Sequence, residues 1–92
     1  MSDKIIVTVS GVDNIGIVAK VTATMAQYSV NIEDIKQTLM QGHFVMFMLC
    51  DTSESNMNFK EIKNALIEEG NKMEVEIWVQ KKGIFEKMHT VG

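Results

Sequence analysis

The stretch GVDNIGIVAKVTATMAQYSVNIEDI, from Gly11 to Ile35, contains the features that decide how this 92-residue chain folds. A polar turn flanked by glycines precedes an amphipathic helix, and an Asn-Ile pair then opens a strand. Asp13 and Asn14 are residue types that cap helices, and Gly16 removes a side chain from the first helical turn, where backbone N–H groups lack intrahelical partners. Because those N–H groups lie at the positive end of the helix dipole, the segment is suited to bind a carboxylate or another anion.

Hydrophobic periodicity predicts six elements in the order strand, helix, strand, strand, helix, strand. Asn58 and Glu61 have the spacing of a capping box, which marks the start of the second helix. Gly42 lies between the two middle strands, where a positive φ favours a tight hairpin. The expected strands cover residues 4–10, 33–40, 44–50 and 73–80, one helix covers residues 15–28, and the other runs from Asn58 to a stop at Gly70 and Asn71.

This order is typical of an α+β, ferredoxin-like βαββαβ sandwich, in which two helices cover one face of an antiparallel sheet with strand order 4-1-3-2. A parallel α/β sheet is disfavoured because the turn between the middle strands is too short for a crossover. The run from Phe44 to Cys50 is apolar without interruption, which predicts a strand buried on both faces. Since two helices cover only one face, we expect the C-terminal segment or a second copy to cover the other.

The length predicts a single domain over residues 1–92, with a short helical C-terminal extension over residues 80–92. A chain of this size has a modest core, so association between copies would add useful buried area. The net charge of -3 and the lack of arginine argue against a nucleic-acid partner. No apolar run approaches the roughly 20 residues that span a bilayer, and the N-terminus lacks the core of a signal peptide, so we expect a cytoplasmic protein without a membrane partner.

Few residues suggest catalysis or metal binding. Cys50 ends an apolar strand without a basic neighbour, which indicates a small buried hydrophobe. His43 and His89 have no carboxylate or cysteine at ligand spacing, so no metal is expected. Neither a Ser-His-Asp set nor a nucleotide-binding loop is discernible. We therefore expect neither an enzyme nor a cofactor.

The glycine-flanked turn and the Asn-Ile pair resemble the signature of ACT domains, the small regulatory modules of amino-acid metabolism. In that signature G-x-D-x-x-G-I precedes the first helix and N-I follows it, and the matching residues here are Gly11, Asp13, Gly16, Ile17, Asn31 and Ile32. With its QKKGIFEKMH segment from Gln80 to His89, nearly the whole chain resembles the free-standing, single-domain ACT proteins of prokaryotes, the UPF0237-like group. One departure is Ile15, at a place where many members carry proline.

In ACT domains that bind amino acids, the ligand lies between the loop before the first helix and the start of the second strand of a neighbouring copy. The resemblance therefore implies ligand contacts for two groups of residues, Asp13, Asn14, Gly16 and Ile17 in one copy and Asn31 in the other. The amides of Gly16 and Ile17 would hold a carboxylate, Asp13 would pair with an ammonium group, and Asn31 can donate and accept. A valine at Gly16 is expected to block the carboxylate at little cost to the helix.

The implied function is that of a regulatory, amino-acid-sensing ACT domain that acts as a homo-oligomer. The alternative is a module on the same fold that dimerises or binds proteins without a ligand.

Overall fold

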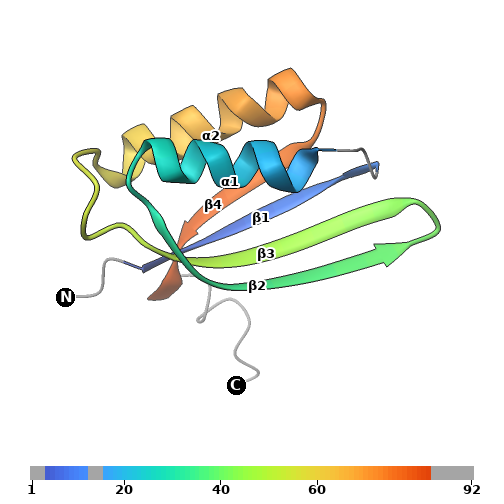
Figure 1. Cartoon of the computed structure of the whole chain (residues 1–92), viewed down its shortest axis with the longest axis horizontal. Helices are drawn as coiled ribbons and strands as arrows, with labels where there is room; N and C mark the ends of the chain where they lie inside the picture. Colours follow the sequence, from blue (N-terminus) through green and yellow to red (C-terminus); the bar gives the residue numbers. More distant parts are fainter. Residues whose placement is uncertain (1–3, 13–15, 84–92) are drawn as a thin grey trace.

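The computed structural model describes residues 4–12 and 16–83, and this part of the chain forms a four-stranded antiparallel sheet and two helices. The elements are β1 (Lys4–Val12), α1 (Ile17–Gln27), β2 (Asn31–Met40), β3 (His43–Asp51), α2 (Phe59–Met73) and β4 (Glu76–Lys81). The sheet order β2-β3-β1-β4 is the predicted order read from the other edge. Both helices lie on one face of the sheet (Figure 1), which confirms the ferredoxin-like prediction.

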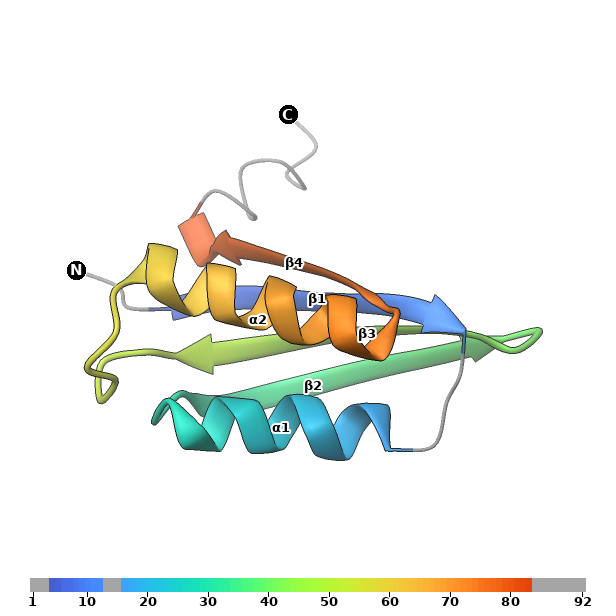
Figure 2. The same ribbon diagram turned by 90° about the horizontal axis from the view of Figure 1, so that it is seen from above.

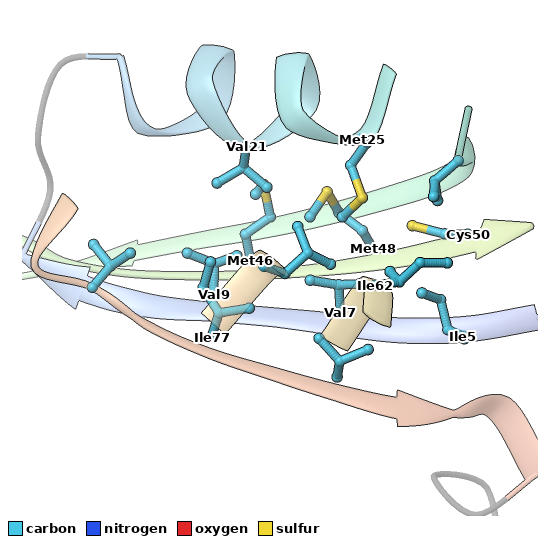
Figure 3. Packing of buried hydrophobic residues seen from close by; sticks show 14 of the residues in the cluster. Ile5, Val7, Val9, Val21, Met25, Met46, Met48, Cys50, Ile62 and Ile77 are labelled. Atoms are coloured by element: carbon cyan, nitrogen blue, oxygen red, sulfur yellow. The ribbon is translucent and has the colours of Figure 1, made fainter. Parts of the chain in front are cut away.

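The core lies between the helices and the two central strands. Val7 of β1 is opposite Met48 of β3, and Val9 is opposite Met46, so these side chains share the face under the helices. All four are fully buried. Figure 3 shows Met25 of α1 pointing down to Met48 on the sheet, while Met46 lies below Val21. The flexible thioethers fill the space between helix and sheet, as methionine commonly does in irregular cores.

Strand β3 is not buried on both faces in a single copy, so the prediction from its apolar run is wrong at this level. Phe44, Met46, Met48 and Cys50 are buried under the helices, whereas Phe47, between them, is 42% exposed. The alternation follows from the pleat, which points successive side chains to opposite faces. The helices cover one of these faces, and the other carries apolar side chains that remain accessible in one copy.

The hairpin between β2 and β3 agrees with the prediction. Gln41 and Gly42 form a two-residue turn with φ values of 52° and 79°, and Met40 is paired with His43 on either side of it. Two successive positive φ values are those of a type I′ turn, whose twist matches that of the flanking strands. Glycine at the second position adopts this conformation without steric cost.

Helix α2 begins as predicted and ends later than predicted. The Asn58 side chain accepts from the Glu61 amide at 2.9 Å, and the Glu61 side chain accepts from the Asn58 amide at 2.9 Å, which completes the capping box. The predicted stop at Gly70 is wrong, because the helix continues to Met73, and β4 begins at Glu76 rather than at residue 73. Gly70 is buried inside the helix, where an added Cβ would lie 2.8 Å from Cγ1 of Ile77.

The glycine at position 70 therefore permits close packing of α2 on β4 rather than ending the helix. The helix instead ends at Glu74, which has a φ of 59°. The Val75 amide donates to the Gly70 carbonyl at 2.9 Å, and the Glu74 amide donates to the Asn71 carbonyl at 3.3 Å. These are the two hydrogen bonds of a Schellman motif, in which glycine is the usual left-handed residue.

The predicted C-terminal extension falls mostly on residues 84–92, which lie outside the described residues. Its first two residues, Gln80 and Lys81, belong to strand β4.

Replacing Glu74 by glycine should stabilise the fold. A non-glycine residue in the left-handed region costs roughly 1 kcal/mol, so Glu74→Gly is expected to raise the free energy of unfolding by about 0.5 to 1 kcal/mol. The matched control is Glu68→Gly at an exposed position inside α2, where glycine should lower it by about 1 kcal/mol. Urea denaturation of the three proteins measures both changes, and a destabilised Glu74→Gly protein would contradict the assignment.

Candidate ligand-binding site

Gly16 stands immediately before α1 as its N-cap residue, with a φ of 89° and a ψ of 0°. Its carbonyl accepts the amide of Lys20 at 2.9 Å, which closes the first turn. A Cβ built at Gly16 would meet no atom within 4 Å, so the space in front of this helix end is open on that side. The sequence analysis predicted Gly16 inside the first helical turn. Gly16 instead immediately precedes the first helical residue, Ile17, in a backbone conformation that strongly favours glycine.

The expectation that valine is tolerated at Gly16 is therefore wrong, because a β-branched residue is strained at this φ whatever space surrounds it. A variant that probes the site without this strain needs asparagine, which adopts the left-handed region more readily.

The described signature residues on this side have structural roles. Ile17 is only 4% exposed, so its side chain belongs to the core and only its backbone is available to a ligand. Gly11 lies in β1, and an added Cβ there would come within 2.8 Å of Cγ1 of Val75. Gly11 is thus needed for close packing near the start of β4. Asp13 and Asn14 lie outside the described residues.

The first turn of α1 contains no acidic side chain. Its backbone N–H groups have no carbonyl partner within the helix, and the helix dipole adds a partial positive charge there. This end of α1 therefore retains the capacity to bind an anion.

Asn31 opens β2 at the far end of α1 and is exposed. The chain reaches it through Ser29, whose φ is 57°, and Val30, whose amide donates to the Met25 carbonyl at 2.9 Å. Val30 is buried, so this turn fixes where β2 begins. Beside Asn31 is a hollow of about 530 Å³, lined by Ser29, Val30, Asn31, Asp51, Ser53 and Glu54.

A charged cluster lies next to this hollow and is formed by residues of three strands. Lys4 of β1 forms ion pairs with Glu33 of β2 and, at 3.2 Å, with Asp51 at the end of β3. The other Asp51 oxygen accepts from the Ser53 amide at 2.9 Å. Sequence reasoning missed this cluster, because its members are 29 and 47 positions apart and only the strand pairing brings them together.

The cluster shifts two acid–base equilibria. Hydrogen bonds from the backbone and side chain of Ser53, together with that from Lys4, lower the pKa of Asp51. The Glu33 carboxylate, followed by Asp51, raises the pKa of Lys4. Both groups are therefore held in their charged forms at neutral pH.

The two predicted halves of the site do not meet within one copy. Gly16 precedes α1 and Asn31 follows it, and a helix of 11 residues is about 16 Å long. Figure 2 shows that the chain enters α1 at one end of the molecule and leaves it at the other. One small amino acid cannot contact both ends in a single copy, so a shared site requires a second chain.

The remaining candidates for chemistry have structural surroundings. Cys50 is buried, and the loss of solvent raises its pKa to about 12, which keeps it a thiol. His43 is exposed, and its Nε2 lies 3.0 Å from Oγ of Ser10. Within residues 4–12 and 16–83 no three side chains of His, Cys, Asp or Glu gather as metal ligands would. In the same ranges neither helix is long and apolar enough to cross a membrane.

The fold and the signature turn define a regulatory ligand-binding module. The family model described as "ACT domain" matches residues 3–80, and the chain belongs to this family. More narrowly, it is a member of the UPF0237 family of small proteins. A UPF0237 protein of Methanosarcina acetivorans is 43% identical over 90 residues, which cover 98% of each chain. One of Clostridium acetobutylicum is 46% identical over 88 residues, covering 96% of this chain and 99% of that one.

Solved structures agree with this assignment. An ACT domain protein from Streptococcus pneumoniae is 35% identical, with a TM-score of 0.81, and the match covers 94% of this chain and 97% of that one. At 20% identity, the regulatory subunit of aspartate kinase from Thermus thermophilus superposes with a TM-score of 0.66 over 87% of this chain and 52% of that one. This second likeness concerns the fold alone. The UPF0237 protein of Listeria innocua and the Streptococcus pneumoniae protein are each matched over 97% of their own length, so their sizes are close to that of this chain.

The Asp51 cluster gives a pH-dependent prediction. The folded pKa of Asp51 lies below its ordinary value of about 3.9, so its carboxylate stabilises the fold above that pH and the stabilisation is lost as the pH falls through the folded pKa. In Lys4→Gln the pKa of Asp51 should rise but stay below the ordinary value, because the Ser53 amide still donates. NMR titration of the carboxyl carbon measures both values. An unperturbed Asp51 in the wild type would refute the cluster.

Proposed function

We propose that this ACT domain senses an amino acid, bound between the α1 start of one copy and the β2 start of another. The proposal rests on the surroundings of Gly16. Its backbone is left-handed, and a Cβ built there would meet no atom within 4 Å. The first turn of α1, which follows it, contains no acidic residue. This end suits the carboxylate of a zwitterion, held by the backbone amides of Gly16 and Ile17. Asp13 and Asn14 lie outside the described residues. The family resemblance implies that they also contact the ligand, and we include them in the proposal.

The second half of the proposed site has the opposite character. Asn31 can both donate and accept hydrogen bonds, and the hollow beside it is lined by the carboxylates Asp51 and Glu54. Such a hollow suits a group that is positively charged, as the ammonium group of an amino acid is. The complementary ends of a zwitterion thus match the two ends of α1. Because these ends are a helix length apart in one copy, the proposed function requires a homo-oligomer.

Regulation would follow from the shared site. A ligand that contacts two copies at once stabilises the arrangement in which both contacts are made, and this changes what the assembled surface presents to an enzyme or regulator. Proteins of the same fold include one named as the regulatory subunit of aspartate kinase and one named as a glycine cleavage system transcriptional repressor. These names are compatible with a regulatory role for this chain.

We also propose that the chain is not an enzyme and needs no cofactor. The buried thiol of Cys50 and the exposed His43 lie on different faces of β3, so they do not form a nucleophile and base. A cytoplasmic location and a single domain over residues 1–92 remain predictions from the sequence.

Calorimetric titration against each of the twenty amino acids tests the binding proposal. For any ligand found, Asn31→Ala should weaken binding by about 1 to 3 kcal/mol, the cost of leaving a buried polar partner without its hydrogen bond. Gly16→Asn should also weaken binding, because it adds a side chain in the space before the helix while tolerating the positive φ. Gln27→Ala, exposed on α1, is the matched control and should bind as the wild type does.

A mixing experiment tests whether the two halves come from different copies. Neither Gly16→Asn nor Asn31→Ala should bind well alone, since every site in either protein has one altered half. In a heterodimer of the two, one site contains both altered halves and the other contains neither. Unfolding and refolding them together should therefore restore part of the binding capacity at wild-type affinity. No recovery in a verified heterodimer would place the ligand within one copy or elsewhere.

The alternative function is a module that associates with itself or another protein without a small ligand. It is favoured by the apolar side chains, including Phe47 and Trp78, that the sheet leaves accessible. A thermal-shift screen separates the two functions, because a ligand that binds the native state raises the unfolding temperature. No shift with any amino acid would favour the interaction module.

A further inference from the structure

The face of the sheet opposite the helices, here called the open face, is apolar at its centre. It carries every second residue of each strand, and the central ones are Ile6, Thr8, Val45, Phe47, Leu49 and Trp78. Phe47 is 42% and Trp78 is 47% exposed. In Figure 1 this face lies below the sheet, on the side away from α1 and α2. Exposed apolar side chains that gather on one face of a sheet favour an interaction site there.

The strand register arranges the open face in rows that run across all four strands. The central row is Lys36 of β2, Phe47 of β3, Thr8 of β1 and Trp78 of β4. The row on one side is Asp34, Leu49, Ile6 and Gln80, and the row on the other side is Thr38, Val45, Ser10 and Glu76. Each row therefore begins with a polar residue on β2 and ends with a residue of another type on β4, so the two edges of the open face differ chemically.

The same face contains both a projection and a depression. Trp78 lies on β4, at one edge of the sheet, and nearly half of its surface is exposed. Toward the other edge is a shallow hollow of about 120 Å³, lined by Ile6, Asp34, Lys36, Phe47, Met48 and Leu49. The indole and the hollow lie on the same face of one copy at separate places, so one copy cannot insert its own Trp78 into its own hollow.

We propose that the open face binds the open face of a second copy, related by a two-fold axis parallel to the strands. This axis lays β2 of each copy over β4 of the other and β3 over β1, with the sheets about 10 Å apart. In the central row it sets Lys36 against Trp78 of the second copy and Phe47 against its Thr8. Because the interface is isologous, each contact occurs twice. The proposal concerns a contact separate from the amino-acid site and does not depend on it.

Size and charge favour this arrangement. The large Phe47 faces the small Thr8 in both directions, and Val45 faces the smaller Ser10, so these residues differ in bulk and can interdigitate. Leu49 faces Ile6, which adds an apolar pair of equal size. The indole of Trp78 enters the hollow beside Lys36, where the ammonium group can lie over the ring. Lys36 also comes within one row of Glu76 of the second copy, a favourable pairing of opposite charges at the rim. An axis across the strands would instead stack Lys36 on Lys36.

Lys36 and Glu76 provide a sharp test, because they cannot pair within one copy. They lie on opposite edge strands, three strand spacings or about 14 Å apart. Lys36→Glu should weaken self-association about tenfold, and Glu76→Lys should do the same, because each places like charges together. The double variant exchanges the charges and should recover most of the wild-type association. Sedimentation velocity over a range of micromolar concentrations measures the dissociation constants of the wild type and the three variants.

Two further variants complete the experiment. Trp78→Glu replaces the exposed indole by a carboxylate and should abolish the contact between the open faces. Because the position is exposed, the circular dichroism spectrum should stay unchanged. Lys63→Glu makes the same charge change as Lys36→Glu on the exposed side of α2 and should leave association unaffected. If the amino-acid site forms a separate contact between copies, Trp78→Glu should halve the number of copies in the assembly and leave amino-acid binding unchanged. A failure of one proposal can then be distinguished from a failure of the other.

Three results would overturn the proposal. The first is a wild type that remains a monomer throughout the concentration range. The second is association that persists unchanged in Trp78→Glu, which would place the contact on another surface. The third is a double charge variant that is weaker than both single variants, which would exclude the pairing of β2 with β4.

Discussion

The structure depends on one constraint: two helices can cover only one face of a four-stranded sheet. The central strand β3 is apolar on both faces, and the pleat divides its side chains between the helices and the exterior. Val7, Val9, Met46 and Met48 build the core. Neither α1 nor α2 covers Phe47 and its neighbours on the other face, and this accounts for the apolar side chains that remain accessible there.

The same constraint separates the two halves of the proposed ligand site. Helix α1 lies along the sheet and covers the core with 11 residues, so its two ends lie about 16 Å apart. Gly16 is fixed at one end by its left-handed backbone, and Asn31 is fixed at the other by the turn that buries Val30. A fold in which the signature residues flank a helix is thus suited to ligands held between copies. In the proposed site, assembly and binding are therefore coupled by geometry.

Most of the fold was accessible from the sequence because its signals are local. Alternation in β1 and β4, the Asn58 capping box and the Gly42 turn depend on residues within a few positions of one another, and the resulting order of elements restricts the topology to few choices. The candidate site was accessible to a lesser degree. A family signature named Gly16 and Asn31, but not the backbone angle at Gly16 or the acidic hollow beside Asn31.

What the sequence by itself determined is the order of elements, the sheet topology and the membership of the ACT family. Tertiary structure decided the role of Gly70, which resembles a helix stop in the sequence but lies inside α2, where Ile77 of β4 leaves no room for a Cβ. It also decided that Lys4, Glu33 and Asp51 meet, and that Lys36 and Trp78 share one row of the open face. Contacts between residues far apart in the chain depend on strand register and helix packing, and no short window of sequence encodes them.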